Sequence, residues 1–387
     1  MTDIKELDKL YVANTYSRFP VEIVKGKGSL CYDKSGKEYI DMGAGIAVNT
    51  FGYSDEEWKA AVIEQLNAFQ HTSNLYYTEP CALLAKTLCG RTGMKKVFFA
   101  NSGAEANECA IKVARKYAAG KYGKDRCNII TLENGFHGRT ITTLAATGQD
   151  VFHKDFGPFP AGFLYAKAND IESVKSLADE KVAAIMIECI QGEGGVKPLD
   201  EKFVKDIAAL CAEKDILLIV DEVQTGNGRT GKLYAYMHYG VKPDIITTAK
   251  GLGGGLPIGA CIMGDKTENV LSFGDHGSTF GGNPVVSAGA LNILNRINDG
   301  LLAEVTKKSE YIFDRLKGAK GVVSVSGKGL MIGVKTEKEG KAVVSACIEK
   351  GVLFLTAKDK VRLLPALNIP FDLLKKAIDT LIEVCEN

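Results

Sequence analysis

The sequence predicts an α/β protein in which a mainly parallel sheet is covered by helices on both faces. Two observations support this prediction. Short apolar runs alternate with amphipathic helical patterns through the middle of the chain, as repeated strand-helix units require. The 387 residues, 45% of them hydrophobic and 25% charged, also exceed what a single core usually organises. We therefore expect a large domain and a smaller one.

The expected strands are short apolar runs, typical of strands buried on both faces, at residues 96–100, 127–132, 182–190, 216–220, 244–248 and 260–263. A helix is expected from Ser102 to about residue 119, because apolar residues recur there on one face, namely Ala106, Ala110, Val113, Ala114 and Tyr117. Ser102 and Glu105 have the spacing of a capping box at its start. A further helix is expected at 201–214, and from about residue 283 longer amphipathic patterns predict a separate C-terminal unit.

Charge and cysteine content argue against several kinds of protein. The formal net charge is +1, so the whole chain has no basic excess for nucleic acid or anionic lipid. The first ten residues lack the apolar core of a signal peptide, and no apolar stretch approaches the roughly 18 residues of a membrane-spanning helix. The ten cysteines form no C-x-x-C pair, which favours reduced, buried thiols over a zinc or disulfide framework. We expect a cytoplasmic protein without a bound metal.

Two charged residues follow predicted strands directly, at the edge where parallel sheets bind ligands. Asp221 follows the run 216–220, and a carboxylate at this rim needs a cationic partner. Lys250 lies just past the run 244–248, and four of the next five residues are glycine, which permits close approach of a flat ligand. Desolvation there lowers the pKa of a lysine, as covalent chemistry with a carbonyl group requires. Taken alone, an Asp after a strand is more often a helix cap or a solvated loop residue, and a Lys before glycines is usually a surface charge. The glycines also resemble a dinucleotide loop, but such a loop opens a helix after the first strand of its unit, which this cluster does not.

Motifs spread over nearly the whole chain favour the functional interpretation. The segments DEVQTGNGRTG (221–231) and TTAKGLGGGLPIGA (247–260) resemble the cofactor site of class-III, fold-type-I aminotransferases. The resemblance extends, in family order, to NTYSRFPVEIVKGKG (14–28), NSGAEANECAIK (101–112), GFHGRTITTLAAT (135–147), ECIQGEGGV (188–196), GSTFGGNP (277–284) and VRLLPALNI (361–369). It implies a large cofactor-binding domain at 51–282 with a mainly parallel seven-stranded sheet. The segment 1–50 and residues 283–387 would form a smaller α+β domain.

The resemblance implies that the cofactor is pyridoxal 5'-phosphate, attached to Lys250 as a Schiff base. Asp221 would pair with the protonated ring nitrogen, which keeps the ring an electron sink. Gln224 would hydrogen-bond the ring oxygen. Phe136 would stack on one face of the ring, and Val223 would cover the other.

The same resemblance assigns the other end of the cofactor. Its phosphate would lie at the start of the helix formed by Ser102, Gly103 and Ala104, where free N–H groups and the helix dipole favour an anion. Thr279 would bind the phosphate of the neighbouring subunit, which implies a homodimer with shared active sites. Glu222, in the motif 221–231, would be a further cofactor residue.

Two arginines are the implied substrate ligands. Arg139 would bind the α-carboxylate of the amino donor, since a planar guanidinium suits a carboxylate, and Ser278 would touch the same substrate. Arg362 would bind the carboxylate of 2-oxoglutarate or glutamate. Glu193 would neutralise Arg362 while a diamine donor is bound and swing aside for the dicarboxylate. A structural salt bridge is the alternative for Arg362, because a charge in its apolar setting needs a partner anyway.

Within the class, the resemblance is greatest to enzymes that transfer the δ-amino group of N2-acetyl-L-ornithine to 2-oxoglutarate. This ping-pong reaction of arginine biosynthesis gives N-acetyl-L-glutamate 5-semialdehyde and L-glutamate. Succinylornithine, ornithine, 4-aminobutyrate and acyl-lysine are alternative donors. An aminomutase is disfavoured by Arg362, because internal transfer needs no dicarboxylate clamp. A non-catalytic protein would not require Asp221, Lys250 and Arg139 together.

Overall fold

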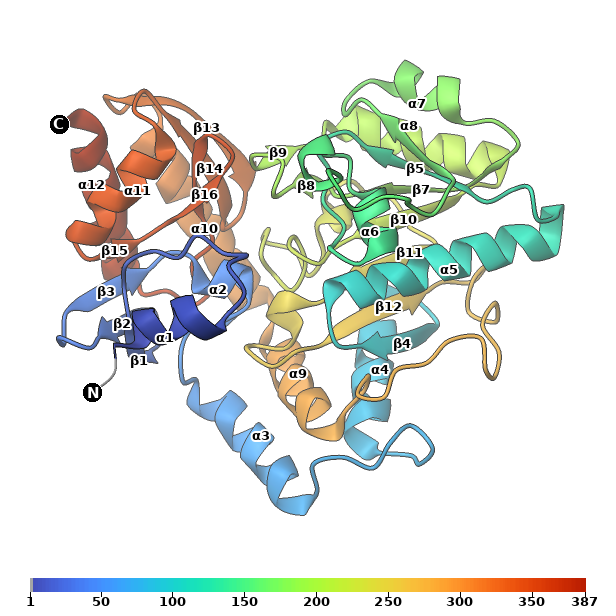
Figure 1. Ribbon diagram of the computed structural model, residues 1–387, viewed down its shortest axis with the longest axis horizontal. Helices are drawn as coiled ribbons and strands as arrows, with labels where there is room; N and C mark the ends of the chain where they lie inside the picture. The colour runs from blue at the N-terminus through green and yellow to red at the C-terminus, as the bar shows by residue number, and fades with distance from the viewer. Residues whose placement is uncertain (1–2) are drawn as a thin grey trace.

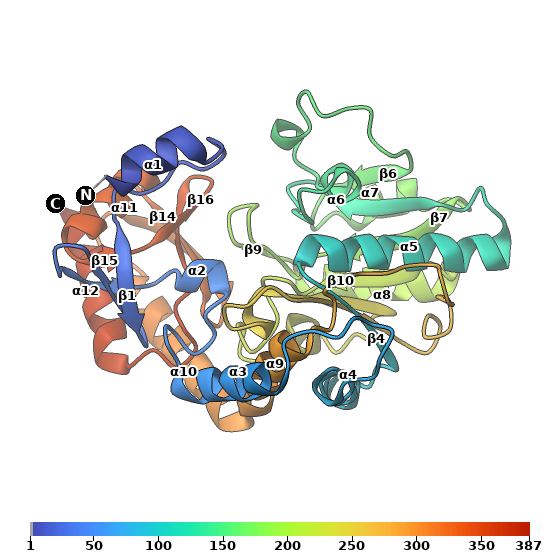
Figure 2. The same cartoon turned by 60° about the horizontal axis from the view of Figure 1, so that its bottom comes forward.

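The computed structural model describes residues 3–387 as two units built from different parts of the chain. Figure 1 shows a large α/β unit on the right, formed by the middle of the chain, and a smaller unit on the left that contains both termini. Helices α3 (Glu56–Ala68) and α9 (Pro284–Arg296) pack against each other at the bottom of Figure 2, between the two units. Within residues 3–387, no helix combines the length and apolar character needed to cross a bilayer.

The large unit is organised around a mainly parallel seven-stranded sheet, as the sequence predicts. In spatial order its strands are β4 (Lys96–Ala100), β12 (Gly259–Met263), β11 (Ile245–Thr248), β10 (Leu217–Asp221), β7 (Val182–Ile187), β5 (Asn128–Leu132) and β6 (Phe163–Ala166). Strand β12 runs antiparallel to both neighbours, and the remaining pairs are parallel. Strands β7 and β10 are buried along their whole length, because helices cover both faces of the sheet.

Alternate residues of the strands build two separate core layers. Ile185 and Ile187 of β7 belong to the larger layer, which α8 (Glu201–Lys214) covers, whereas Ala184 and Met186 point to the opposite face. The long helix α5 (Gly103–Tyr122) packs on that opposite face with the small-residue surface that the sequence predicts. The other helices of the large unit are α4 (Glu79–Thr92), α6 (Ile141–Ala146) and α7 (Ile171–Leu177).

The predicted strands agree with the structure to within a few residues, with two differences. Strand β6, a four-residue run at the edge of the sheet, is not predicted. The run expected to continue to Ile190 ends at Ile187. Residues 190–198 instead form a short hairpin of β8 (Ile190–Gln191) and β9 (Lys197–Pro198).

The smaller unit contains two four-stranded sheets. The first is β1 (Ile23–Lys27), β2 (Leu30–Asp33), β3 (Glu38–Asp41) and β15 (Val352–Leu353). The second is β13 (Val322–Lys328), β14 (Met331–Thr336), β17 (Lys360–Leu363) and β16 (Leu355–Ala357). Its helices are α1 (Ile4–Tyr11), α10 (Asp299–Leu316), α11 (Gly340–Glu349) and α12 (Phe371–Glu386).

Residues from both ends of the chain share the core of this smaller unit. Tyr39 and Met42 are buried in the same cluster as Leu381 of α12. Helix α9, in contrast, contributes Ala290 and Ile293 to the core of the large unit, although residue 284 lies beyond the expected boundary. The domain boundaries at residues 50 and 282 therefore stay predictions.

Candidate active site

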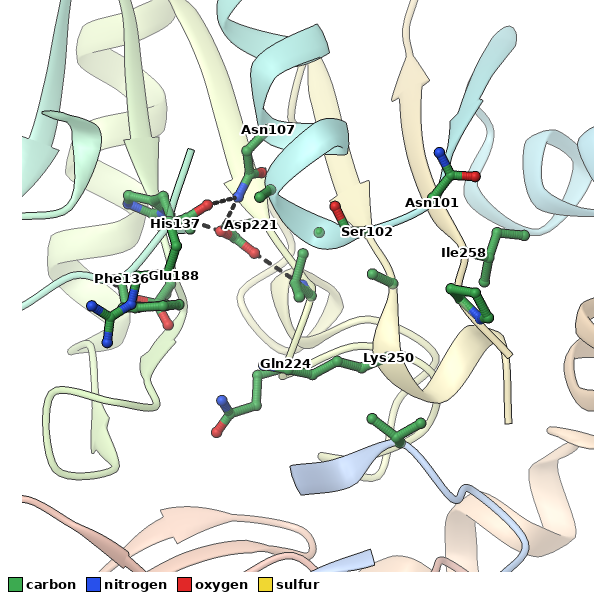
Figure 3. A pocket seen from close by; sticks show the side chains of 18 of the residues that line it. Asn101, Ser102, Asn107, Phe136, His137, Glu188, Asp221, Gln224, Lys250 and Ile258 are labelled. Atoms are coloured by element: carbon green, nitrogen blue, oxygen red, sulfur yellow. Dashed lines mark hydrogen bonds and ion pairs between the residues drawn. The ribbon is translucent and has the colours of Figure 1, made fainter. Parts of the chain in front are cut away.

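A cavity of about 610 Å³ lies beyond the carboxyl ends of the central strands. Figure 3 shows side chains from the large unit converging on it. Of the residues predicted for the site, those that line the cavity are Ser102, Gly103, Ala104, Phe136, Arg139, Asp221, Val223, Gln224 and Lys250. Segments that are far apart in the sequence thus meet at the edge of the sheet where the strand pattern places a ligand.

Lys250 occupies a strained turn directly after β11. It begins a single 3₁₀ turn (Lys250–Leu252) with φ +46°, a left-handed conformation that costs a non-glycine residue roughly 1–2 kcal/mol. Hydrogen bonds hold the turn, since Thr50 Oγ1 donates to the carbonyl oxygen of Gly251 at 2.7 Å and Asn227 Nδ2 donates to that of Ala249 at 3.1 Å. The surrounding packing therefore fixes the lysine in a conformation that it would not adopt alone.

The amine of Lys250 has a lowered pKa. Desolvation is the main cause; the carboxylates of Glu193 and Asp221 oppose it, and the charge of Arg362 adds to it. The direction agrees with the sequence-based expectation for a lysine at this rim. A neutral amine is both a nucleophile and a base, so the site is suited to covalent and proton-transfer chemistry at this atom.

Asp221 ends β10 and is held by three hydrogen bonds. Its Oδ2 accepts from Asn107 Nδ2 at 2.8 Å and lies 2.8 Å from His137 Nδ1, and its Oδ1 accepts from the backbone N–H of Val223 at 3.0 Å. Figure 3 shows Asn107 and His137 both directed at this carboxylate. His137 is thus the ionisable side chain that pairs with Asp221 in the structure. Burial lowers the pKa of His137, but the hydrogen bond and charge of Asp221 outweigh burial and raise it overall.

A second buried carboxylate supports the same wall. Glu188 Oε1 accepts from the backbone N–H of Phe136 at 2.8 Å, and Oε2 accepts from that of Gly192 at 3.2 Å. Burial raises the pKa of Glu188 to about 7, although the charge of His137 acts in the opposite direction. Glu188 also lines the cavity. It therefore joins the motif around Phe136 to the loop that follows Gly192.

The start of α5 forms the opposite end of the cavity. Glu105 N donates to Ser102 Oγ at 3.2 Å, which is one half of the predicted capping box. The other half differs, because Glu105 Oε2 accepts from the backbone N–H of Asn101 at 2.6 Å rather than from that of Ser102. A Cβ at Gly103 would lie 2.6 Å from Val223 Cγ1, which only glycine avoids. The glycine thus brings the helix N-terminus and its free N–H groups close to the floor of the cavity.

Arg139 is exposed at the mouth of the cavity and stacks on aromatic rings. Its guanidinium lies 3.9 Å from the centroid of the Phe152 ring and 5.6 Å from that of Phe136. The two rings meet edge to face at a centroid distance of 5.9 Å. Stacking of this kind restrains an arginine without neutralising its charge, so the guanidinium stays available to an anion.

Glu193 and Arg362 form an ion pair between the two units. Glu193 lies on the β8–β9 hairpin and Arg362 on β17, and Arg362 Nη1 donates to Glu193 Oε1 at 2.5 Å. Burial raises the pKa of Glu193, but the charge and hydrogen bond of Arg362 outweigh burial and lower it overall. Both residues lie beside Gln224, which lines the cavity.

Besides Glu193 and Arg362, three predicted residues are not part of the cavity wall. Glu222 points into the protein, where Thr225 Oγ1 donates to its Oε2 at 2.5 Å and Tyr236 N donates to its Oε1 at 2.8 Å. The alternation of side chains after a strand explains this, because Asp221 faces the cavity and its neighbour does not. Ser278 and Thr279 belong to a loop beside Asn101, whose Nδ2 donates to Ser278 Oγ at 3.2 Å.

Comparisons with known proteins define the class of this chain. The sequence profile of the class-III aminotransferases matches residues 11–385. The chain therefore belongs to the class-III aminotransferases, and it is an aminotransferase.

Individual relatives narrow the comparison. The chain is 51% identical to the acetylornithine aminotransferase of Haemophilus ducreyi, with 98% of both chains covered, and 47% identical to that of Caldanaerobacter subterraneus, with 97% and 98% covered. Among solved structures, the fold is similar to an ornithine aminotransferase from Toxoplasma gondii crystallised with partial occupancy of PLP, at a TM-score of 0.94 and 32% identity over 99% of this chain and 94% of that one. The fold is also similar to that of the N-acetylornithine aminotransferase from Stenotrophomonas maltophilia, at a TM-score of 0.85 and 34% identity over 98% of this chain and 97% of that one.

Proposed function

We propose that this chain transfers the δ-amino group of N2-acetyl-L-ornithine to 2-oxoglutarate. The products would be N-acetyl-L-glutamate 5-semialdehyde and L-glutamate, and the reaction would serve arginine biosynthesis in the cytoplasm. The proposal is carried by four acetylornithine aminotransferases that are 45–51% identical to the chain over nearly its full length. The cofactor of the proposal is pyridoxal 5'-phosphate, which the Toxoplasma relative binds at its active site.

The residues of the cavity fit this cofactor at both of its charged ends. The buried carboxylate of Asp221 would bind a protonated ring nitrogen, and the N-terminus of α5 would bind a phosphate. The absence of a side chain at Gly103 leaves the approach to that helix free. Phe136 and Val223 provide apolar surfaces for the two faces of a flat ring. Lys250 would hold the aldehyde carbon covalently.

The reaction would then depend on what these side chains do. Bound there, pyridoxal phosphate supplies a sink for the negative charge that develops at the carbon carrying the reacting amine. The Asp221 carboxylate, supported by His137, keeps a proton at the ring nitrogen. Lys250 Nζ would take a proton from the δ-carbon of the donor, a role for which its lowered pKa is suited.

Two arginines would orient the substrates. Arg139 would bind the α-carboxylate of N2-acetylornithine, with Ser278 beside it. Arg362 would bind the side-chain carboxylate of 2-oxoglutarate once Glu193 has moved away. While the donor is bound, Glu193 would cover Arg362, so that one pocket accepts a substrate reacting at its side chain and another reacting at its α-carbon.

A homodimer would complete the site through Thr279. This residue follows Ser278 in a loop that Asn74 binds, since Asn74 Nδ2 donates to the carbonyl oxygens of Ser278 at 2.8 Å and Gly281 at 2.9 Å. The segments on either side of this contact expose large apolar side chains, namely Leu75, Tyr76, Tyr77 and Phe280, and Phe273 is exposed earlier in the same stretch of chain. Exposed apolar side chains in such number are typical of an interface. We propose that a second copy covers them and receives Thr279 at its phosphate site.

A panel of amino donors tests this proposal. The purified holoenzyme is assayed with 2-oxoglutarate and N2-acetylornithine, N2-succinylornithine, ornithine, 4-aminobutyrate or an acyl-lysine. We expect kcat/KM for N2-acetylornithine to exceed that for each of the other donors by at least about tenfold. A higher value for any other donor would reassign the substrate within the class.

A further inference from the structure

A third side chain joins the Glu193–Arg362 ion pair. Gln224 Nε2 donates to Glu193 Oε1 at 3.3 Å, and Gln224 Oε1 accepts from Arg362 Nη1 at 3.4 Å. The same Nη1 atom donates to the same carboxylate oxygen of Glu193 at 2.5 Å. The three groups therefore form a closed triangle in which each one contacts the other two.

The three members differ in their freedom to move. Gln224 is 6% exposed and lies against Gly192, where a Cβ would come within 2.5 Å of the Gln224 amide oxygen. Arg362 is fixed in β17, which pairs with strands on both sides, and its side chain is 4% exposed. The side chain of Glu193 is 30% exposed. Glu193 is thus the member of the triangle with room to leave.

The backbone beneath Glu193 is anchored at both ends of its loop. Gly192 N donates to Glu188 Oε2 at 3.2 Å, and the carbonyl oxygen of Val196 accepts from Ser326 Oγ at 2.7 Å. The side chain of Val196 is fully buried in a cluster with residues of the smaller unit. Departure of Glu193 is therefore a rotation of its side chain, and the hydrogen bond from Gln224 opposes that rotation directly.

We propose that Gln224 is a positioning residue that sets how long Glu193 covers Arg362, and thereby the balance between the amino donor and the dicarboxylate acceptor. This inference rests on the proposed function of Arg362. With Glu193 in place, the Gln224 amide nitrogen steadies the carboxylate. With Glu193 rotated away, the Gln224 amide oxygen still contacts the guanidinium and keeps it aimed at an incoming carboxylate. The amide nitrogen carries two hydrogens, so this role is compatible with a second contact to the cofactor.

Two substitutions at Gln224 should act in opposite directions. Gln224→Glu places a carboxylate beside Arg362 that has no room to rotate away, so Arg362 stays neutralised. Gln224→Leu removes the donor that retains Glu193, so Arg362 is uncovered more often. The readout is the affinity of the holoenzyme for glutarate, an unreactive dicarboxylate with the chain length of 2-oxoglutarate, measured by calorimetric titration.

We expect Gln224→Glu to weaken glutarate binding by at least about tenfold and Gln224→Leu to tighten it by about three- to tenfold. In single-turnover measurements, the half-saturating concentration of 2-oxoglutarate should follow the same order, whereas the maximal rate of the donor half-reaction should fall more in Gln224→Leu than in Gln224→Glu. The split between the two half-reactions separates positioning from a general loss of structure or of cofactor.

The matched control is Gln191→Leu, on the same hairpin as Glu193. The amide of Gln191 is equally buried, but it donates to the carbonyl oxygen of Glu133, so this variant should bind glutarate as the parent does. Glutarate affinities that change in the same direction in both Gln224 variants, or by less than about twofold, would overturn the inference. Arg362→Ala tests the proposed function separately: if it leaves glutarate binding unchanged, Arg362 is no clamp, whatever Gln224 does.

Discussion

Two regions of the molecule hold their charges in different ways: the fixed wall of the cavity around Asp221, and the Glu193–Arg362 ion pair beside Gln224, which forms an exchangeable wall next to the cavity. In the wall formed by the large unit, Asp221 is 4% exposed and accepts hydrogen bonds from Asn107, His137 and a backbone N–H. Beside Gln224, Arg362 contacts the partly exposed Glu193, which belongs to a different unit. The Nε atom of Arg362 has no hydrogen-bond partner among residues 3–387.

This difference separates a charge whose partners stay the same from a charge whose partner must be exchanged during the reaction. A carboxylate with three partners is pre-organised and costs little reorganisation when a ligand arrives. A guanidinium with a displaceable partner can exchange that partner for a substrate carboxylate. The cost of burying its charge is offset by a carboxylate before and after the exchange. A ping-pong enzyme needs both, since its cofactor contacts serve two half-reactions and its substrate contacts serve only one.

The largest expected effect comes from the fixed wall at Lys250. Lys250→Ala removes both the covalent attachment and the proton carrier, so turnover should fall by at least about 10⁴-fold. The visible absorbance of lysine-bound cofactor should disappear with it. Lys202→Ala, which changes an exposed lysine of α8, is the control and should keep both signals. Activity within about a hundredfold of the parent would show that the amine has no central role.

The next effect in size tests the charge of Asp221. Asp221→Asn preserves the shape of the side chain but removes the charge, so we expect kcat/KM to fall by about 10²–10³-fold. The pKa of His137 should fall as well, because the hydrogen bond and charge of Asp221 are what raise it. The imidazole titration, followed by NMR in parent and variant, measures this directly. An unchanged His137 titration would contradict the assigned partnership.

Part of the fixed wall could be predicted from the sequence, because its residues follow the ends of strands. Apolar runs locate β10 and β11, and the rule that ligands bind beyond the carboxyl ends of strands then selects Asp221 and Lys250. The supporting residues His137, Glu188 and Asn107 were not predicted. His137 lies in the motif 135–147, but its contact with Asp221 joins residues 84 positions apart. It depends on the order of the sheet, in which only β7 separates β5, the strand before His137, from β10, which ends at Asp221.

Strand β6, at the edge of the sheet, was harder to predict from the sequence than the central strands. Strand β6 is a short apolar run, FLYA, directly after glycine and proline residues that are typical of a loop, so it stands out less than the longer runs of β7 and β10. The depth of Glu222 was also missed, since one position separates a residue that faces the cavity from one that faces the core. Resemblance to the family's motifs identifies the segments that form the site, whereas the direction of each side chain depends on the conformation of the backbone.

A third, smaller effect distinguishes Glu222 from its neighbour Asp221. Burial raises the pKa of Glu222 to about 7 from its ordinary value of 4.5. The folded state therefore binds this proton more tightly than the unfolded chain, so the stabilisation is present below about pH 4.5 and is lost as pH rises through 7. Between pH 5 and 8, the free energy of unfolding of the parent should decrease by about 2–3 kcal/mol more than that of Glu222→Gln. Urea unfolding at the two pH values measures the difference, and parallel changes in both proteins would place this carboxylate in a more polar environment.

The smallest expected effect lies on the exchangeable wall. Glu193→Ala leaves Arg362 uncovered in both half-reactions, so 2-oxoglutarate should bind about tenfold more tightly and the amino donor should react more slowly. Discrimination between the two substrates, rather than overall turnover, is therefore the quantity to measure, by single-turnover kinetics of each half-reaction. Glu201→Ala, at an exposed ion pair on α8, provides the control. If Glu193→Ala left both half-reactions as they are in the parent, the ion pair with Arg362 would be structural, and the difference between the two walls would have no catalytic meaning.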